Sequence, residues 1–208
     1  MDKIQHKHFR AIVVGVSMGG VEALRTLLGG LPQGFSLPII IVHHISPESG
    51  SDLAHLLDTC CAIRVKEADE GDVLAPGTAY LAPPNYHLLV ERDGTLTLSV
   101  DLLVNFARPS IDVLFESAAD AFGPNLIGVI LSGAGSDGAK GLKIIQDKGG
   151  LAIVQDPADA EADPMPRSAL AAVRADHVLV LKEIPPLLCS LAAAEHRVMV
   201  KGHCDDGT

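Results

Sequence analysis

Short apolar segments alternate with amphipathic ones along most of the chain. The apolar segments are four to six residues long and rich in Val, Ile and Leu, which is typical of strands buried on both faces. The predicted strands are residues 11–16, 37–42, 62–65, 126–131, 151–154 and 177–181. Between them, apolar positions recur at helical spacing, and glycine pairs follow two of these segments as stop signals. The predicted helices are residues 21–28, 51–57, 110–121, 139–148, 167–173 and 184–194.

This alternation predicts an α/β fold with three layers, α/β/α, around a doubly wound, mostly parallel sheet of Rossmann-like topology. The pattern changes between residues 75 and 100, where residues 87–90 and 95–99 flank an Asp-Gly turn. These segments predict a small β-hairpin at the sheet edge. We expect one domain, residues 1–208, with its core at about 9–194 and loose ends at 1–8 and 201–208.

Composition and charge limit the classes of partner and the cellular compartment that we expect for this protein. The net charge is −10 without a cluster of Lys and Arg, which argues against nucleic acid as a partner. No apolar run approaches the roughly 20 residues of a membrane span, and the N-terminus has no hydrophobic signal core. The four cysteines show neither zinc spacing nor a disulfide framework. We therefore expect a cytoplasmic protein with no membrane insertion.

The first predicted strand runs into Gly15-Val16-Ser17-Met18-Gly19 and then into a predicted helix. A strand, a Gly-x-Ser-x-Gly turn and a helix in this order are the layout of a nucleophile elbow, which exposes a serine hydroxyl to a base and to free backbone N–H groups. The alternative is a tight turn that binds a phosphate at the helix N-terminus. The segment lacks both the Gly-x-Gly of dinucleotide sites and the Gly-Lys-Ser/Thr of P-loops. Whether this turn carries a nucleophile or binds a phosphate depends on whether other segments of the chain supply a base and an acid.

Two other predicted strands end in residues that suit these roles. Residues 37–42 are followed by His43 and His44, and residues 126–131 are followed by a glycine-rich loop that contains Asp137. Ligands bind at the carboxyl ends of strands in doubly wound sheets, so these side chains are expected beside Ser17. Singly, the histidines suit ordinary strand ends and Asp137 suits a helix cap. Together they favour a Ser-His-Asp hydrolase, although strand alternation does not choose between the two histidines.

Six ordered motifs resemble the catalytic domain of the chemotaxis protein-glutamate methylesterase, CheB, over nearly the whole chain. The motifs are Gly15-Val16-Ser17-Met18-Gly19-Gly20, Val42-His43-His44-Ile45, Ala82-Pro83-Pro84 with His87, Arg108-Pro109-Ser110-Ile111-Asp112-Val113-Leu114-Phe115, Leu131-Ser132-Gly133-Ala134-Gly135-Ser136-Asp137-Gly138, and Gln155-Asp156 followed by Met165-Pro166-Arg167.

The resemblance implies a catalytic triad of Ser17, His44 and Asp137. His44 is selected because the histidine of the family is the second of its pair, usually after Gln, and His43 stands where that Gln would be. The implied activity is hydrolysis of glutamyl γ-methyl esters on the cytoplasmic helices of chemoreceptors, often with deamidation of receptor glutamines. Both reactions pass through an acyl-enzyme and use no metal or other cofactor.

Two positions depart from the family pattern. Met18 replaces a residue that is commonly smaller and polar, and Ala134 replaces a usual Met. Their backbone N–H groups remain the predicted oxyanion donors. Arg108, Met165 and Arg167 are predicted to border the substrate, whereas the alternative makes Arg108 part of a helix start and the other two part of a covering loop.

Only ten residues precede the first predicted strand, whereas the usual family protein carries an N-terminal receiver domain. The expectation is either an excised catalytic domain or a stand-alone methylesterase, with a separate receiver or methyltransferase protein as a possible partner. Two other functions stay open. One is a serine esterase or amidase with a different protein or small-molecule substrate, which the changed residues Met18 and Ala134 would allow. The other is a binding module, against which the intact set of Ser17, His44 and Asp137 speaks.

Overall fold

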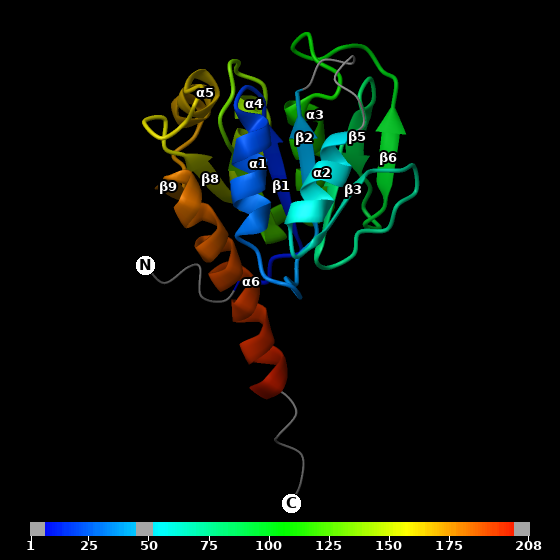
Figure 1. The fold of residues 1–208 in the computed structure, drawn as a ribbon, viewed down its shortest axis with the longest axis vertical. Coiled ribbons are helices and arrows are strands. Elements are labelled where there is room, and N and C mark those ends of the chain that lie inside the picture. Colours follow the sequence, from blue (N-terminus) through cyan, green and yellow to red (C-terminus); the bar gives the residue numbers. More distant parts are fainter. Residues whose placement is uncertain (1–6, 45–51, 202–208) are drawn as a thin grey trace, which may run out of the picture.

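A computed structural model of the chain describes residues 7–44 and 52–201. Seven parallel strands form one sheet in the order β3-β4-β2-β1-β7-β8-β9 (Figure 1). The strands are β1 (Ala11–Val16), β2 (Ile39–His43), β3 (Arg64–Glu67), β4 (Thr78–Leu81), β7 (Leu126–Ile130), β8 (Leu151–Gln155) and β9 (His177–Leu179). The predicted fold class is confirmed.

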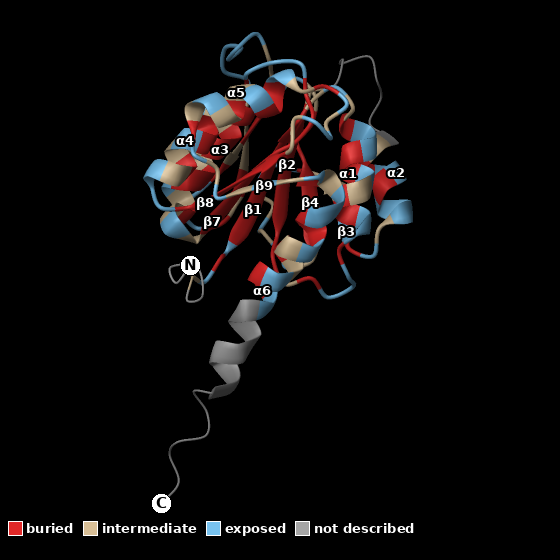
Figure 2. Ribbon diagram, turned by 90° about the vertical axis from the view of Figure 1, so that its left-hand side faces the viewer, coloured by how far each residue is buried: buried red, intermediate tan, exposed pale blue. Residues whose placement is uncertain are grey.

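Helices cover both faces of the sheet. One layer holds α1 (Gly20–Gly29), α2 (Asp52–Cys60) and α6 (Ile184–Lys201), and the other holds α3 (Ile111–Phe122), α4 (Ala139–Asp147) and α5 (Pro164–Ala172). The short 3-10 helices η1 (Gly123–Asn125) and η2 (Leu181–Glu183) precede β7 and α6. The central strands of the sheet are buried and the helices expose their outer sides to solvent (Figure 2), whereas the edge strands β3 and β9 are only partly buried.

Alternation along the central strands divides the core into two halves. In β1, Ile12 and Val14 pack toward α1, whereas Val13 packs toward α3, and none of the three is exposed. In β2, Ile41 and Val42 divide in the same way. Burying an aliphatic side chain of this size contributes roughly 1.5–3 kcal/mol, so both layers are firmly held to the sheet.

The predicted hairpin forms from β5 (His87–Val90) and β6 (Leu96–Ser99), which pair antiparallel as a separate two-stranded sheet. Its buried residues Leu88 and Leu96 join the core half that contains α3. One strand of this region was not predicted. Residues 78–81 are β4, which lies between β3 and β2 in the main sheet. Four residues ending at a Pro-Pro break carry too little periodicity to identify a strand, and pairing with two neighbours creates it.

Several predicted boundaries also shift. Helix α5 begins at Pro164 and not at residue 167, and α6 continues to Lys201, beyond the predicted end of the core at 194. Of the predicted loose ends, residues 1–6 and 202–208 lie outside the described residues. Within the described ranges, no helix combines the length and apolar character that crossing a membrane requires.

Strand order brings the three predicted catalytic segments together. Strand β1 lies between β2 and β7, so the chain winds outward in both directions from it. Ser17 follows β1, His44 follows β2, and Asp137 lies in the loop after β7. The crevice between the carboxyl ends of such diverging strands is the usual ligand site of an open α/β sheet.

Candidate active site

Backbone hydrogen bonds connect the three strand ends. Val16 pairs with His43 in the parallel register, so Ser17 and His44 are the next residues of neighbouring strands. The His44 N–H donates to the Val16 carbonyl over 3.1 Å, and the Ser17 N–H donates to the Ser132 carbonyl over 3.0 Å. The position of the nucleophile segment is therefore set by both of its neighbours.

The segment after β1 has the conformation of a nucleophile elbow. Gly19 precedes α1 with a φ of +75°, a left-handed conformation that favours glycine. The Ser17 carbonyl accepts a hydrogen bond from the Gly20 N–H over 2.9 Å, which closes the turn. The predicted strand, turn and helix are present, and Ser17 lies at their junction with its side chain only partly buried.

The two adjacent histidines have different partners. His44 Nε2 lies 2.9 Å from Asp137 Oδ2, whereas His43 Nε2 lies 3.1 Å from the carbonyl oxygen of Ser17. A carbonyl only accepts, so His43 donates through Nε2, and burial lowers its pKa and favours this neutral form. Only His44 reaches the carboxylate, while His43 supports the backbone of the elbow.

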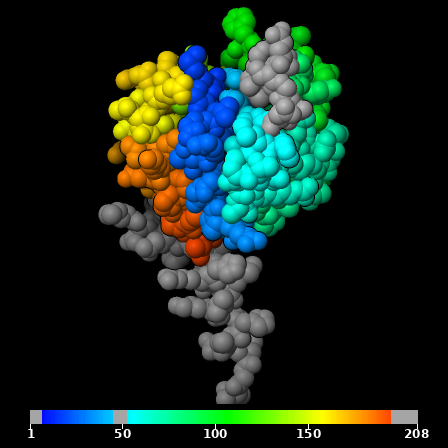
Figure 3. Space-filling model, viewed as in Figure 1, coloured from blue at the N-terminus to red at the C-terminus, as the bar shows by residue number. Residues whose placement is uncertain are grey.

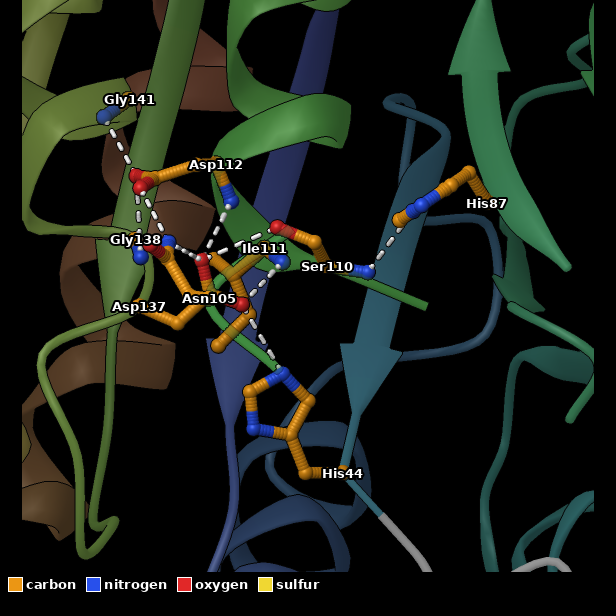
Figure 4. A network of polar contacts seen from close by, with 9 residues as sticks. All are labelled: His44, His87, Asn105, Ser110, Ile111, Asp112, Asp137, Gly138 and Gly141. Atoms are coloured by element: carbon orange, nitrogen blue, oxygen red, sulfur yellow. Dashed lines mark hydrogen bonds and ion pairs between the residues drawn. The ribbon is translucent and has the colours of Figure 1, made fainter. Parts of the chain in front are cut away.

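Asp137 receives hydrogen bonds from two loops and from the start of α3 (Figure 4). The donors are His44 Nε2 (2.9 Å), Asn105 Nδ2 (2.9 Å), Ser110 Oγ (3.0 Å), Ile111 N (2.7 Å) and Asp112 N (3.1 Å). Burial by itself raises the pKa of Asp137, but these donors, led by His44, outweigh it and lower the pKa from 3.8 to about 2. Asp137 is therefore an ionised acceptor, His44 Nε2 carries a proton, and His44 Nδ1 is left as the basic atom.

Asp112 and Asn105 belong to this network although sequence analysis gave them no role. The Asp112 carboxylate accepts hydrogen bonds from the N–H groups of Gly138 (3.0 Å) and Gly141 (2.7 Å). Asn105 Nδ2 donates to it over 2.9 Å. Burial and the nearby charge of Asp137 raise the pKa of Asp112, against the effect of these hydrogen bonds. In sequence, Asp112 looks like an ordinary acid in a first helical turn, and no signal distinguishes Asn105.

His87, which is buried, connects the hairpin to the start of α3. Its Nδ1 accepts the Ser110 N–H over 3.2 Å, and its Nε2 lies 3.0 Å from the carbonyl oxygen of Leu102. A neutral ring with the proton on Nε2 satisfies both contacts. His87 therefore holds the loop that carries Asn105 and has no contact with the carboxylates.

The predicted oxyanion donors are available. No described residue accepts a hydrogen bond from the backbone N–H of Met18 or Ala134. By contrast, the N–H of Gly133 donates to the Ala162 carbonyl. Ala134 lies in the loop between β7 and Asp137, and Met18 begins the turn into α1. The two N–H groups therefore belong to segments that follow two neighbouring strands, β7 and β1.

An open cleft of about 660 Å³ joins these groups. Its walls are formed by the elbow, the end of β2 and the loops before β5, α3 and α4, through Ser17, His44, Asn85, Leu103, Asn105, Phe106, Ala107, Arg108, Pro109, Ala134, Gly135, Ser136 and Asp137. Ser17, His44 and Asp137 thus share one cavity, as predicted from the strand ends.

The three residues predicted to border the substrate have different positions. Arg108 lines the cleft, but its Nη1 donates to the carbonyl oxygens of Val100 (2.7 Å) and Asp101 (2.9 Å). Met165 does not border the cleft, because the earlier start of α5 turns it inward against Gly133, where it is 1% exposed. Arg167 is exposed, pairs with Asp163 and does not line the cleft either.

Comparison with known proteins finds a matching family model, related sequences and a solved structure of the same fold. A family model described as CheB methylesterase matches residues 12–188. A protein of Leptospira interrogans, provisionally named protein-glutamate methylesterase/protein-glutamine glutaminase, is 51% identical over 184 residues, which cover 88% of this chain and 95% of that one. The protein-glutamate methylesterase FrzG of Myxococcus xanthus is 43% identical over 173 residues, covering 83% of this chain and 52% of FrzG. The crystal structure of the Thermotoga maritima CheB methylesterase catalytic domain matches with a TM-score of 0.84 and 34% identity, covering 88% of this chain and 98% of that one.

Proposed function

The chain belongs to the CheB methylesterase family, and from this premise we propose that it is a cytoplasmic protein-glutamate methylesterase that uses Ser17 as its nucleophile. The substrates are glutamyl γ-methyl esters on the cytoplasmic helices of chemoreceptors. His44 is the general base and then the general acid, and Asp137 orients it. The observation that carries the proposal is the shared cleft, in which His44 bonds to Asp137 through one ring nitrogen and no described residue bonds to the other.

In the first half of the reaction, Ser17 Oγ attacks the γ-carbonyl carbon of the ester while His44 Nδ1 takes the serine proton. The ionised Asp137 stabilises the imidazolium that results. The backbone N–H groups of Met18 and Ala134 stabilise the oxyanion of the tetrahedral intermediate. The C–O bond to the methoxy group then breaks, methanol leaves with the proton from His44, and a glutamyl ester of Ser17 remains.

In the second half, water attacks the acyl-enzyme and gives its proton to His44, which returns it to Ser17 as the C–O bond to the enzyme breaks. The products are a glutamate side chain and free enzyme. A receptor glutamine follows the same steps with ammonia as the leaving group, so one cleft serves both ester hydrolysis and deamidation.

The decisive experiment measures methanol release from receptor cytoplasmic fragments premethylated at glutamate. We expect release by the wild-type chain and loss of at least about 10³-fold in Ser17→Ala and His44→Ala, with unchanged thermal unfolding of Ser17→Ala. Near-normal turnover by Ser17→Ala would exclude the mechanism. Reaction of Ser17 with a fluorophosphonate without methanol release would retain the serine hydrolase and exclude the receptor as its substrate.

A further inference from the structure

The rim of the catalytic cleft is formed here by residues 100–106, of which Leu103, Asn105 and Phe106 line the cavity, and it carries an unusual concentration of exposed apolar side chains. Of the twelve large apolar residues that are exposed in the described chain, five lie between residues 100 and 106. They are Val100, Leu102, Leu103, Val104 and Phe106, of which Phe106 is fully exposed at 100%. In the space-filling view, green atoms of this part of the chain project at the end of the molecule where α1 begins (Figure 3).

Phe106 lies in a turn whose backbone does not suit a phenylalanine. Val104 and Ala107 exchange two backbone hydrogen bonds, of 3.1 and 2.9 Å, around the central residues Asn105 and Phe106. Both central residues have positive φ, 51° and 62°, the pattern of a type I′ turn, which prefers Asn followed by Gly. Asn105 follows this preference, whereas Phe106 places a bulky aromatic residue in a left-handed conformation.

The two sides of this turn face different surroundings. Asn105 points inward and donates to both Asp112 and Asp137, whereas Phe106 points to solvent and still lines the cleft that contains Ser17. An exposed aromatic side chain in an unfavourable backbone conformation contributes nothing to the core. Such features persist mainly where a residue has a binding role.

The charges of the residues that line the cleft indicate what kind of substrate surface can bind at this rim. Arg108 is the basic residue among those lining the cleft, and its Nη1 is occupied by two backbone carbonyls. The negative charge of Asp137, which also lines the cleft, balances the positive charge of Arg108, so Lys and Arg give the lining no excess of positive charge for an acidic side chain. A methyl-esterified glutamate is uncharged, and an uncharged side chain within an apolar stretch of helix matches an apolar rim.

We infer that Phe106, with Leu102 and Leu103, forms a docking contact for the substrate helix, beside the glutamyl ester that enters the cleft. The inference rests on the proposed function and adds the surface by which the enzyme distinguishes a receptor helix from a small ester. The partner is an amphipathic helix that carries neutral glutamyl esters next to apolar residues. Phe106 has the role of an anchoring aromatic residue.

The test compares wild type with Phe106→Gly on premethylated receptor fragments and on p-nitrophenyl acetate. Glycine suits the turn, so Phe106→Gly should unfold at the same or a higher temperature than wild type. We expect kcat/KM for the receptor fragment to fall about tenfold, mainly through KM, relative to kcat/KM for the small ester. Phe106→Leu should lower kcat/KM for the receptor fragment by a smaller factor. Leu56→Ala, which removes an exposed leucine from α2 outside the cleft, should keep the wild-type ratio.

Binding of the receptor fragment to the inactive Ser17→Ala variant separates this inference from the proposed function. If the wild type releases no methanol, the proposed function fails. The binding measurements on inactive Ser17→Ala protein, with and without Phe106→Gly, then decide by themselves whether Phe106 is a docking contact. At least about tenfold weaker binding by the Ser17→Ala, Phe106→Gly double variant supports that role. Equal binding by both variants, no binding by either, or an unchanged kinetic ratio overturns it. Self-association of the wild type that Phe106→Gly abolishes also overturns it, because the contact then belongs to a second copy.

Discussion

Asp112 and Asp137 cap each other's helices. The Asp137 carboxylate accepts the N–H of Asp112 in the first turn of α3, over 3.1 Å, and the Asp112 carboxylate accepts the N–H of Gly138, which precedes α4, over 3.0 Å. Asn105 Nδ2 lies 2.9 Å from an oxygen of each carboxylate. The orienting acid of the proposed triad is thus held by the N-terminus of α3, and Asp112 is held by the N-terminus of α4; at both ends positive partial charge stabilises an anion.

Replacing Asn105 should reduce catalysis without changing the nucleophile. Asn105→Ala removes one of five donors to Asp137, a hydrogen bond worth about 1 kcal/mol, so kcat should fall roughly fivefold to tenfold. Asn105→Asp should lose more, because it places a third carboxyl group between two carboxylates. Steady-state methanol release measures both variants. Unchanged kcat in Asn105→Ala would show that the remaining four donors suffice.

Substitution of His43 and substitution of His44 should have very different effects on activity. His43 only donates to the Ser17 carbonyl, and a glutamine amide can replace that bond, so His43→Gln should keep activity within about threefold. His44→Gln removes the proposed base and should lose at least about 10³-fold. The comparison uses methanol release under identical conditions. Equal losses in the two variants would contradict the assignment of His44.

Asp137 should contribute a pH-dependent part of the stability. Its folded-state pKa is about 2 against an ordinary 3.8, so its contribution of about 2 kcal/mol is present above about pH 5 and is lost as the pH falls toward 2. Urea unfolding of wild type and Asp137→Asn between pH 6 and pH 2.5 measures this. The stability gap between the two proteins should shrink as the pH falls.

The raised pKa of Asp112 acts in the opposite direction, since it favours folding at low pH. Removing the Asp137 charge also lowers the pKa of Asp112, so this opposing contribution is smaller in Asp137→Asn than in wild type and cancels only in part from the difference. A stability gap that does not change with pH would contradict a strongly lowered pKa for Asp137.

Gly141 should be intolerant of a side chain. A Cβ atom there would lie 2.5 Å from the Cβ of Phe115 and 3.2 Å from the Asp112 backbone, so Gly141→Ala must push α4 away from α3. We expect a loss of about 1–3 kcal/mol of unfolding free energy, together with reduced activity. Gly29→Ala is the control, because that position in α1 has free space, and it should leave stability equal or slightly higher. Similar unfolding midpoints for the two variants would contradict the close packing.

Regular patterns in the chain determined the alternation of strands and helices, the hairpin, and the strand ends that carry Ser17, His44 and Asp137. These features depend on local chemistry: runs of aliphatic residues, glycine at turns and polar residues where a strand leaves the core. Six ordered motifs then identified the family, which the comparisons confirm. The proposed roles of the three residues are still a prediction that the kinetic experiments test.

Tertiary structure decided what depends on partners far apart in sequence. It inserted β4 between β3 and β2, turned Met165 into the core, and brought Asn105 to Asp137, 32 positions away. Hydrophobic periodicity along the sequence indicates whether a residue is buried, but it does not indicate which distant residue packs against it. A short strand, an inward methionine or a bridging asparagine is specified by pairing and packing between segments, and those contacts exist only once the sheet has assembled.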